Sequence, residues 1–372
     1  MARTTFAVVA VLGAVSLVCG CEEEKKAPAT APSASAAAPP ASTAAAPAAP
    51  KPKPEELSSR TIKAAVVAWN AHDAAKVAAN YEPTARLVIA GLPEMSGKDA
   101  IAANAKDNFT AYPDFKVAVT RSFAKGNTAV FEWTITGKND GPSMGKPATG
   151  RQMGVTGVGV ATFDDDGLIK EEHRYLDLPT IQSQLDPKAK AGTFRAPVAL
   201  PTGPTEEHVS KGTPDEAKTI EQGDAIIKAD ESKDEKALMA TVSADYVWQD
   251  NTSATTITPA NLKTAQGAYN TAFPDWTMPH KLTIAADGYY VIEATFTGTQ
   301  KGPMGPVKAT NKPVKVGMVD IQLIKDGKAT KEWSYFNSAD LLIQLGAMPP
   351  MVPPVPAGSA VAATTPTVAK PK

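Results

Sequence analysis

The sequence predicts two tandem α+β domains. The strongest observation is an internal repeat, in which residues 166–185 return as residues 326–345. Tyr175 and Tyr335 stand at the same place in the two copies, 160 residues apart. Within each repeat, apolar residues first recur at helical spacing and then alternate as they do in strands, which is the order of an α+β domain. A chain of 372 residues with only 6% aromatic residues and 32 prolines fits two modest domains diluted by poorly folded segments.

The N-terminus has the pattern of an exported lipoprotein. Arg3 precedes an apolar run at 6–18, which is too short to span a bilayer and suits a secretory signal peptide over residues 1–20. The run ends in Leu-Val-Cys-Gly-Cys21, which resembles a bacterial lipobox. The resemblance implies that Cys21 carries the lipid; an ordinary signal peptide is the alternative. We expect an exported protein anchored to the cell envelope, on the periplasmic face or the cell surface.

Three further segments lack a periodic apolar pattern. Residues 21–56 are mostly Ala, Pro, Ser and Thr, which have too little apolar surface to fold, so we expect a disordered stalk. Residues 187–213 are rich in Pro, Gly, Lys and Thr and are expected to form a linker. Residues 348–372 are expected to form a disordered tail.

Charge and cysteine content exclude several classes of function. The chain has 38 basic and 39 acidic residues and a net charge of −1, so it has no basic excess for a nucleic-acid partner. If Cys21 is lipidated and Cys19 leaves with the signal peptide, no free thiol, disulfide or thiolate metal ligand remains. The histidines lack the spacing of a metal site, and no phosphate-binding loop follows a strand. We therefore expect no metal and no cofactor.

The first domain, expected over residues 57–186, opens with helices. Ile62, Val66 and Trp69 recur at helical spacing, and Ser58 or Ser59 is expected to cap that helix.

A second short helix, capped by Asp73, is expected to carry Val77 and Tyr81. A third helix opens at Gly97-Lys98-Asp99.

Strands follow, because the apolar period changes to two. The alternating runs are Phe115 to Phe123, Ala129 to Ile135 and Val155 to Phe163, and Asp164 to Gly167 form the turn into a last strand.

The second domain, expected over residues 214–347, repeats this plan. Pro214 starts its first helix after Thr213, and Asp234 stands where the first domain has Asp73. Thr258 is expected to cap the third helix, and Tyr290 to Phe296 repeat the alternating strand.

Short motifs recur in the same order in both domains. In the first domain they are Tyr112-Pro-Asp-Phe115, Gly137…Gly141, Lys146-Pro-Ala-Thr-Gly-Arg151, Asp166-Gly167, Glu172-His-Arg-Tyr-Leu-Asp177 and Gln184-Leu185. In the second they are Phe273-Pro-Asp-Trp276, Gly298…Gly302, Lys308-Ala-Thr310, Asp326-Gly327, Glu332-Trp-Ser-Tyr-Phe-Asn337 and Gln344-Leu-Gly346. With these motifs both domains resemble the SnoaL-like polyketide cyclase (ester cyclase) branch of the nuclear-transport-factor-2-like superfamily.

The resemblance implies a cone, in which N-terminal helices pack on a strongly curved antiparallel sheet and leave an apolar pocket at the open end. In the cyclases an Asp at the end of the late strand is the acid/base of an intramolecular aldol closure, and Asp177 stands there. The family often has Trp four residues earlier, where this chain has His173 in the first domain and Trp333 in the second. The second domain has Asn337 in place of the Asp, so any such chemistry is expected in the first domain only.

Asp177 has two interpretations. Strand periodicity places Glu171, His173, Tyr175 and Asp177 on one face, so Asp177 could be a base with His173 as its auxiliary if that face lines the pocket. Alternatively Asp177 caps the helix that Pro179 begins, a role that Asn337 fills equally well in the second domain.

Aromatic residues are the candidate ligand-binding residues. They are Trp133, Tyr175, Trp333 and Tyr335. Simple core packing is the alternative for these side chains.

Two functions are consistent with this sequence. The favoured one is a binding module that holds a small apolar ligand or a protein partner, because the second copy lacks the acid. The other is a cyclase or isomerase type of enzyme that uses Asp177. We expect the two domains to pack as an internal pseudo-dimer, or the protein to form a homodimer.

Overall fold

The computed structural model describes residues 51–189 and 194–351. The predicted signal peptide, Cys21, nearly all of the expected stalk and most of the expected tail lie outside the described residues. No helix in the described part of the chain is long and apolar enough to cross a membrane.

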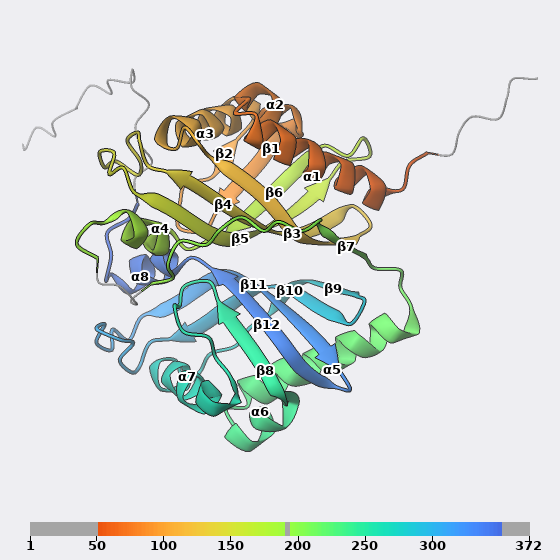
Figure 1. Cartoon of the computed structure of the whole chain (residues 1–372). Helices are drawn as coiled ribbons and strands as arrows, with labels where there is room; N and C mark the ends of the chain where they lie inside the picture. Colours follow the sequence, from red (N-terminus) through yellow and green to blue (C-terminus); the bar gives the residue numbers. More distant parts are fainter. Residues whose placement is uncertain (1–50, 190–193, 352–372) are drawn as a thin grey trace, which may run out of the picture. The chain divides into compact units, whose positions relative to one another are not determined.

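The first domain is an α+β unit built on one sheet, as Figure 1 shows. Its elements are α1 (Pro54–Asn70), α2 (Ala74–Ala79), β1 (Tyr81–Ile89), β2 (Met95–Ser96), α3 (Lys98–Ala111), β3 (Lys116–Lys125), β4 (Thr128–Lys138), β5 (Gln152–Phe163), β6 (Ile169–Tyr175) and α4 (Leu178–Leu185). The strand order is β2-β1-β6-β5-β4-β3-β7, in which β7 (Glu206–Val209) comes from the segment expected to be a linker.

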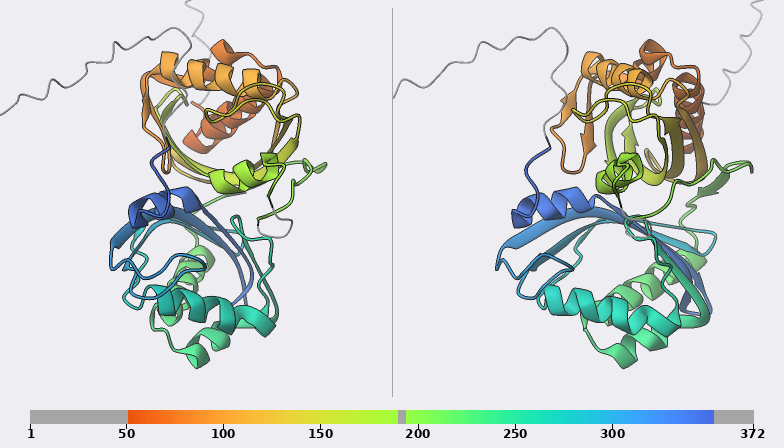
Figure 2. Two further views of the ribbon diagram at one scale, coloured as in Figure 1. Left: turned by 90° about the vertical axis from the view of Figure 1, so that its left-hand side faces the viewer. Right: turned by 60° about the vertical axis from the view of Figure 1, so that its left-hand side comes forward.

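The second domain repeats this architecture. Its elements are α5 (Pro214–Glu231), α6 (Glu235–Thr241), β8 (Val242–Asp250), α7 (Pro259–Ala272), β9 (His280–Ala286), β10 (Tyr289–Thr299), β11 (Pro313–Lys325), β12 (Lys328–Phe336) and α8 (Ser338–Leu345). The strand order is β8-β12-β11-β10-β9. In both domains the N-terminal helices, α1 to α3 or α5 to α7, lie along one face of a curved sheet (Figure 2).

The predicted α+β class is confirmed, but the sheets are not purely antiparallel. The first strand of each domain, β1 or β8, was not predicted from the sequence; β1 pairs in parallel with β6, and β8 pairs in parallel with β12. Tyr81 begins β1 and was wrongly expected on the preceding helix.

The predicted caps are mostly confirmed. Asp73, Thr213, Asp234 and Asn337 each accept a hydrogen bond from the backbone of the helix that they begin. The first helix is the exception: it begins at Pro54, so Ser58 and Ser59 lie inside it and do not cap it. Pro suits a first helical position, which explains the earlier start.

Both faces of each sheet are buried. One face packs against the helices of its own domain. The other faces the opposite sheet, where buried residues of the two domains form a common cluster. From the first domain the cluster takes Phe123, Val130, Val158, Val160 and Tyr175, and from the second Ile284, Val291, Val319, Ile321 and Tyr335.

Candidate functional site

Strand alternation decides which side chains face the helices of each domain, here called the interior. On β12, Glu332 and Ser334 face the interior of the second domain, whereas Trp333 and Tyr335 pack against the first sheet. Tyr175 on β6 also belongs to the cluster between the sheets. The expectation that Tyr175, Trp333 and Tyr335 line a pocket is therefore wrong. Side chains do alternate along these strands as predicted, but the face that carries these three residues packs against the other sheet, and the opposite face lines the interior. Trp133 does face the interior of the first domain, where it packs in the core.

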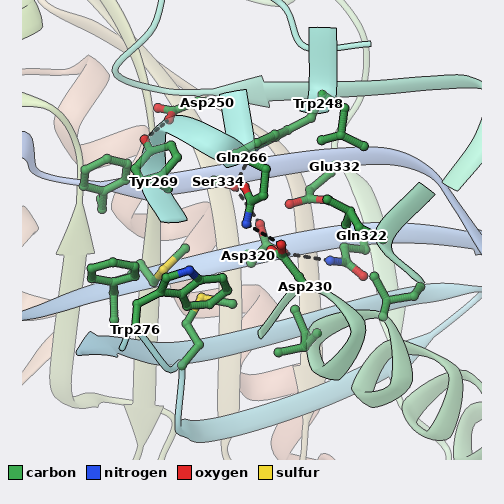
Figure 3. Close-up of a pocket in the computed structure, with 18 of the residues that line it drawn as sticks. Asp230, Trp248, Asp250, Gln266, Tyr269, Trp276, Asp320, Gln322, Glu332 and Ser334 are labelled. Carbon is green, nitrogen blue, oxygen red and sulfur yellow. Dashed lines mark hydrogen bonds between the residues drawn. The ribbon is translucent and has the colours of Figure 1, made fainter. Parts of the chain in front are cut away.

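The second domain contains a cavity of about 110 Å³ (Figure 3). Helices α5, α6 and α7 form one side of it, and strands β8, β10, β11 and β12 form the other. Much of the wall is aromatic, with side chains from Tyr246, Trp248, Tyr269, Phe273, Trp276 and Phe296. Most ligand pockets have such an apolar wall with a few polar groups in fixed positions.

Four carboxyl groups line this cavity. Asp250 on β8 accepts from Thr252 N and Oγ1 (2.7 Å each), and the other three come from Asp230 on α5, Asp320 on β11 and Glu332 on β12. Asp320 is only 1% exposed and accepts hydrogen bonds from Ser334 Oγ (2.7 Å) and Gln322 Nε2 (3.1 Å).

The other two acids are held in the same way. Glu332 accepts from Tyr246 Oη (2.6 Å), and Asp230 accepts from the side-chain amide of Gln266. All of these partners are neutral, so hydrogen bonds position the carboxyl groups without compensating their charge.

The position of these acids changes their protonation. Burial raises the pKa of Asp230 to about 7, and the negative charge of Asp320 contributes to the rise. Burial likewise raises the pKa of Asp320 to about 6. The pKa of Glu332 lies well above its ordinary value, because of burial first and the neighbouring charge of Asp320 second. None of the described residues that line the cavity is Lys, Arg or His.

Gln322 has an unused acceptor. Its side chain lines the cavity and is 2% exposed, and its Nε2 donates to Asp320. Its Oε1 is buried and has no hydrogen-bond donor among the described residues. A buried acceptor without a donor costs free energy, so this oxygen marks a place where a ligand's donor is favourable.

The interior of the first domain is neutralised by its own side chains. Glu172, the counterpart of Glu332, pairs with Arg174 (Nε to Oε1, 2.7 Å). Arg174 also donates to Tyr81 Oη (2.9 Å) and lies over the Trp69 ring at 5.5 Å. The sheet registers relate Arg174 to Ser334, because Arg174 pairs with Gly159 as Ser334 pairs with Asp320. The second domain therefore lacks the arginine and has an extra carboxyl group at Asp320.

Asp177 lies outside this cavity, at the start of α4, and is 1% exposed. Its Oδ2 accepts from Thr180 N (2.9 Å) and Oγ1 (2.6 Å), which is the predicted helix cap. Its Oδ1 accepts from Ser338 N (2.9 Å) and Oγ (2.6 Å) in the second domain. Burial raises the pKa of Asp177, while these four hydrogen bonds oppose the rise. Both of its oxygens are therefore fully engaged in structure.

Asn337 makes the reciprocal contact. Its Oδ1 accepts from Leu178 N (3.1 Å) of the first domain and from Ala339 N (3.2 Å) of its own helix. Its Nδ2 donates to the carbonyl oxygen of Ala90 (2.6 Å). A carboxylate has no such donor, so the difference between Asp177 and Asn337 follows from their hydrogen bonds.

His173 also contacts the second domain, and it makes no hydrogen bond with Asp177. Its Nδ1 lies 2.5 Å from Glu293 Oε1 and its Nε2 lies 2.8 Å from Glu171 Oε1. The hydrogen bond with Glu293 raises the pKa of His173 most, and burial opposes the rise.

Within residues 51–189 and 194–351, no group of three or more His, Cys, Asp or Glu side chains has the arrangement of a metal site.

Comparisons with known proteins agree with the two-domain architecture. Residues 62–172 match the SnoaL-like domain, and residues 223–345 match the SnoaL-like polyketide cyclase family. No curated protein matches the chain.

Three solved structures are similar to single domains. AclR of Streptomyces galilaeus is 23% identical over 36% of this chain and 84% of its own, with a TM-score of 0.34. A SnoaL-like protein from Jannaschia sp. CCS1 is 21% identical over 35% of this chain and 93% of its own, with a TM-score of 0.32. IdmH of Streptomyces antibioticus is 18% identical over 35% of this chain and 99% of its own, with a TM-score of 0.32. The two family matches establish that this chain carries two SnoaL-like domains in tandem and is related to the polyketide cyclases.

Proposed function

We propose that the protein is an exported, lipid-anchored binding protein whose second domain holds a small, largely apolar ligand. The observation that carries this proposal is the cavity of about 110 Å³ with its aromatic wall and its polar groups at one side. The lipobox-like Leu-Val-Cys-Gly-Cys21 motif supports the anchor. A tether at Cys21 would keep a captured ligand at the membrane surface.

The two domains are proposed to have different roles. The first domain places the Arg174–Glu172 pair in its interior, where the second has a cavity lined by Ser334 and Glu332. We assign ligand binding to the second domain and assign to the first the support of that domain through the sheet-to-sheet contact.

A substitution taken from the first domain tests this assignment. Ser334→Arg places an arginine where the first domain has Arg174, beside Glu332, and should fill the cavity. We expect ligands found by native mass spectrometry or by thermal-shift screening of the purified protein to be lost in this variant. Ser232→Arg, at an exposed position after α5, is the matched control and should keep them. Wild-type protein that carries no ligand and responds to none of a lipophilic library would remove the proposal.

Acid/base catalysis is the second candidate function. Asp230 and Asp320 favour it, because carboxyl groups with pKa values of about 7 and 6 in an apolar pocket can exchange protons near neutral pH. The resemblance pointed to Asp177 instead, whose oxygens are occupied by four hydrogen bonds.

Turnover distinguishes the two positions. Aldol-prone and ester substrates should be offered to the wild type, to Asp177→Asn and to Asp230→Asn. If the second candidate is right, Asp230→Asn abolishes turnover. If turnover is lost in folded Asp177→Asn and kept in Asp230→Asn, the catalytic residue lies in the first domain.

A further inference from the structure

We propose that the ligand of the second domain is a small organic cation, a protonated amine with a compact apolar body, whose ammonium group lies among Asp230, Asp320, Glu332 and Gln322. This inference rests on the proposed binding function and names the chemical class of the ligand. Three features of the cavity favour such a cation.

The first feature is uncompensated acidity. Asp230, Asp320 and Glu332 line one cavity, and their hydrogen-bond partners there are the neutral side chains of Gln266, Ser334, Gln322 and Tyr246. Buried carboxylates are normally paired with a cation, since an isolated buried charge is costly. The first domain obeys this rule, because Arg174 pairs with Glu172 there. In the second domain none of the described residues that line the cavity is Lys, Arg or His, so a cationic ligand would supply the missing charge.

The second feature is the free acceptor of Gln322. Its Oε1 is buried and has no donor among the described residues, and its side chain lines the same cavity. The adjacent Nε2 donates to Asp320, which holds the amide with this oxygen as its remaining acceptor. An ammonium group offers N–H donors and no acceptor, so it complements an amide oxygen beside carboxylates.

The third feature is the aromatic wall, which includes Trp248, Tyr269 and Trp276. Cations are attracted to aromatic faces, and tryptophan is the most favourable of them. Lys233 already makes such a contact with this wall, since its Nζ lies 5.0 Å from the centre of the Trp276 ring. The same wall buries an apolar body by the hydrophobic effect.

The volume of the cavity and the arrangement of its ligating side chains restrict the chemical class of the ligand. The cavity of about 110 Å³ is somewhat smaller than the ~150 Å³ cavities that accept benzene, so the body should have at most about six carbon atoms. A metal ion fits poorly, because no cluster of ligating side chains in the described part of the chain has the arrangement of a metal site.

Protonation of Asp230 and Asp320 should make the binding of a cationic ligand depend on pH. Asp230 and Asp320 have pKa values of about 7 and 6, so both are largely ionised at pH 8 and largely protonated at pH 5. An alkylamine keeps its charge over this range. The other titratable groups around the cavity are Glu332, Tyr246, Asp250 and Tyr269, and Lys233 contacts Trp276 of its wall.

The experiment is calorimetric titration of the full-length protein with cyclohexylamine, its neutral analogue cyclohexanol, and magnesium chloride. We expect cyclohexylamine to bind at pH 8 at least tenfold more tightly than cyclohexanol, and to weaken at least tenfold at pH 5. Cyclohexanol binding should change little with pH, and magnesium should not bind.

Two variants test whether the ammonium group binds beside Asp230 and Asp320. Asp230→Asn and Asp320→Asn each keep the side-chain shape and should each weaken cyclohexylamine at pH 8 by about tenfold, while leaving cyclohexanol unchanged. Asp245→Asn removes the same charge from an exposed position on β8 and should change neither ligand.

The outcomes separate this inference from the function on which it rests. If cyclohexanol binds as tightly as cyclohexylamine at pH 8, the proposal that the ligand is a cation is wrong, although the proposal that the domain binds a small molecule stands. If amine binding persists unchanged in both Asp variants, the ammonium position is wrong. If neither molecule binds and a broader library of amines and neutral analogues also fails, both the inference and the binding function fall.

Discussion

Tyr175 of the first domain donates a hydrogen bond of 2.6 Å to Glu293 of the second. The contact recurs with the domains exchanged, since Tyr335 of the second domain donates to Glu132 of the first. Burial first, and the facing carboxylate second, raise the pKa of both tyrosines far above the ordinary value, so both stay protonated donors. These two bonds give the sheet-to-sheet contact an internal twofold pattern.

Removing one of these donors should weaken the contact between the sheets. Tyr335→Phe leaves Glu132 paired with Arg121 (2.6 Å), and Tyr175→Phe leaves Glu293 bonded to His173. A buried acceptor that loses one partner costs about 1–3 kcal/mol, so each variant should lower the free energy of unfolding by that amount. Urea denaturation followed by tryptophan fluorescence measures it. A change below about 0.3 kcal/mol in both variants would show that the bonds do not hold the sheets.

His173 should make this contact depend on pH. Its pKa in the folded protein is raised, first by the hydrogen bond with Glu293, so the folded state binds the proton more tightly than the unfolded state does. The stabilisation is therefore complete below the unfolded pKa of about 6.5 and is lost as pH rises through the raised folded value.

The measurement is the difference in unfolding free energy between the wild type and His173→Gln from pH 5.5 to 9. We expect the wild type's advantage to be largest at the acidic end and to shrink with rising pH. The same substitution made in a Glu293→Gln background should show little of this dependence, because the carboxylate partner is gone. An advantage that grows with pH would contradict the assignment.

The repeat and the change of apolar period predicted two α+β domains correctly, because both patterns follow directly from packing. The strands β1 and β8 were missed for a local reason. Two successive exposed residues, Pro83 and Thr84, interrupt the apolar alternation of β1, as Ala244 and Asp245 do in β8. Tyr81 was expected on a helix because it follows Val77 at helical spacing.

The interior face was assigned wrongly because both faces of each sheet are buried. When one face of a sheet is exposed, polar residues mark it, but here the second face packs against the other sheet and carries Tyr175 and Tyr335. The two repeats differ at a position that marks the interior of the second domain. Asp230 stands four residues before the cap Asp234, as Trp69 stands four before Asp73, so an acid replaces an apolar residue at one position of the repeat.

The acids of the cavity should reduce stability where they are charged. Asp230 has a folded pKa of about 7 against an unfolded value near 3.8, so its contribution to stability is fully present below about pH 4 and is lost as pH rises to about 7. Asp230→Asn keeps an acceptor for Gln266 and removes the charge. We expect the variant to exceed the wild type by about 1–4 kcal/mol above pH 7 and to match it near pH 4.

Thermal or urea unfolding without added ligand at pH 4 and pH 8 measures this difference. Asp245→Asn, which is exposed, should give the same small change at both pH values. A variant less stable than the wild type at pH 8 would mean that Asp230 is compensated by a cation within the protein.

Asp177 and Asn337 each cap a helix of their own domain and also accept hydrogen bonds from the other domain, and neither should be replaceable by the other residue type. Asp177→Asn turns an amide N–H₂ toward the hydroxyl and amide donors of Ser338 or Thr180, and Asn337→Asp turns a carboxylate oxygen toward the Ala90 carbonyl. Each mismatch is buried, so each should lower the free energy of unfolding by about 1–3 kcal/mol. Asp234→Asn, at the exposed cap of α6, should cost under about 0.5 kcal/mol because Asn caps a helix as well as Asp does. If all three substitutions cost the same small amount, the caps act only within their own helices and the hydrogen bonds between the domains add nothing.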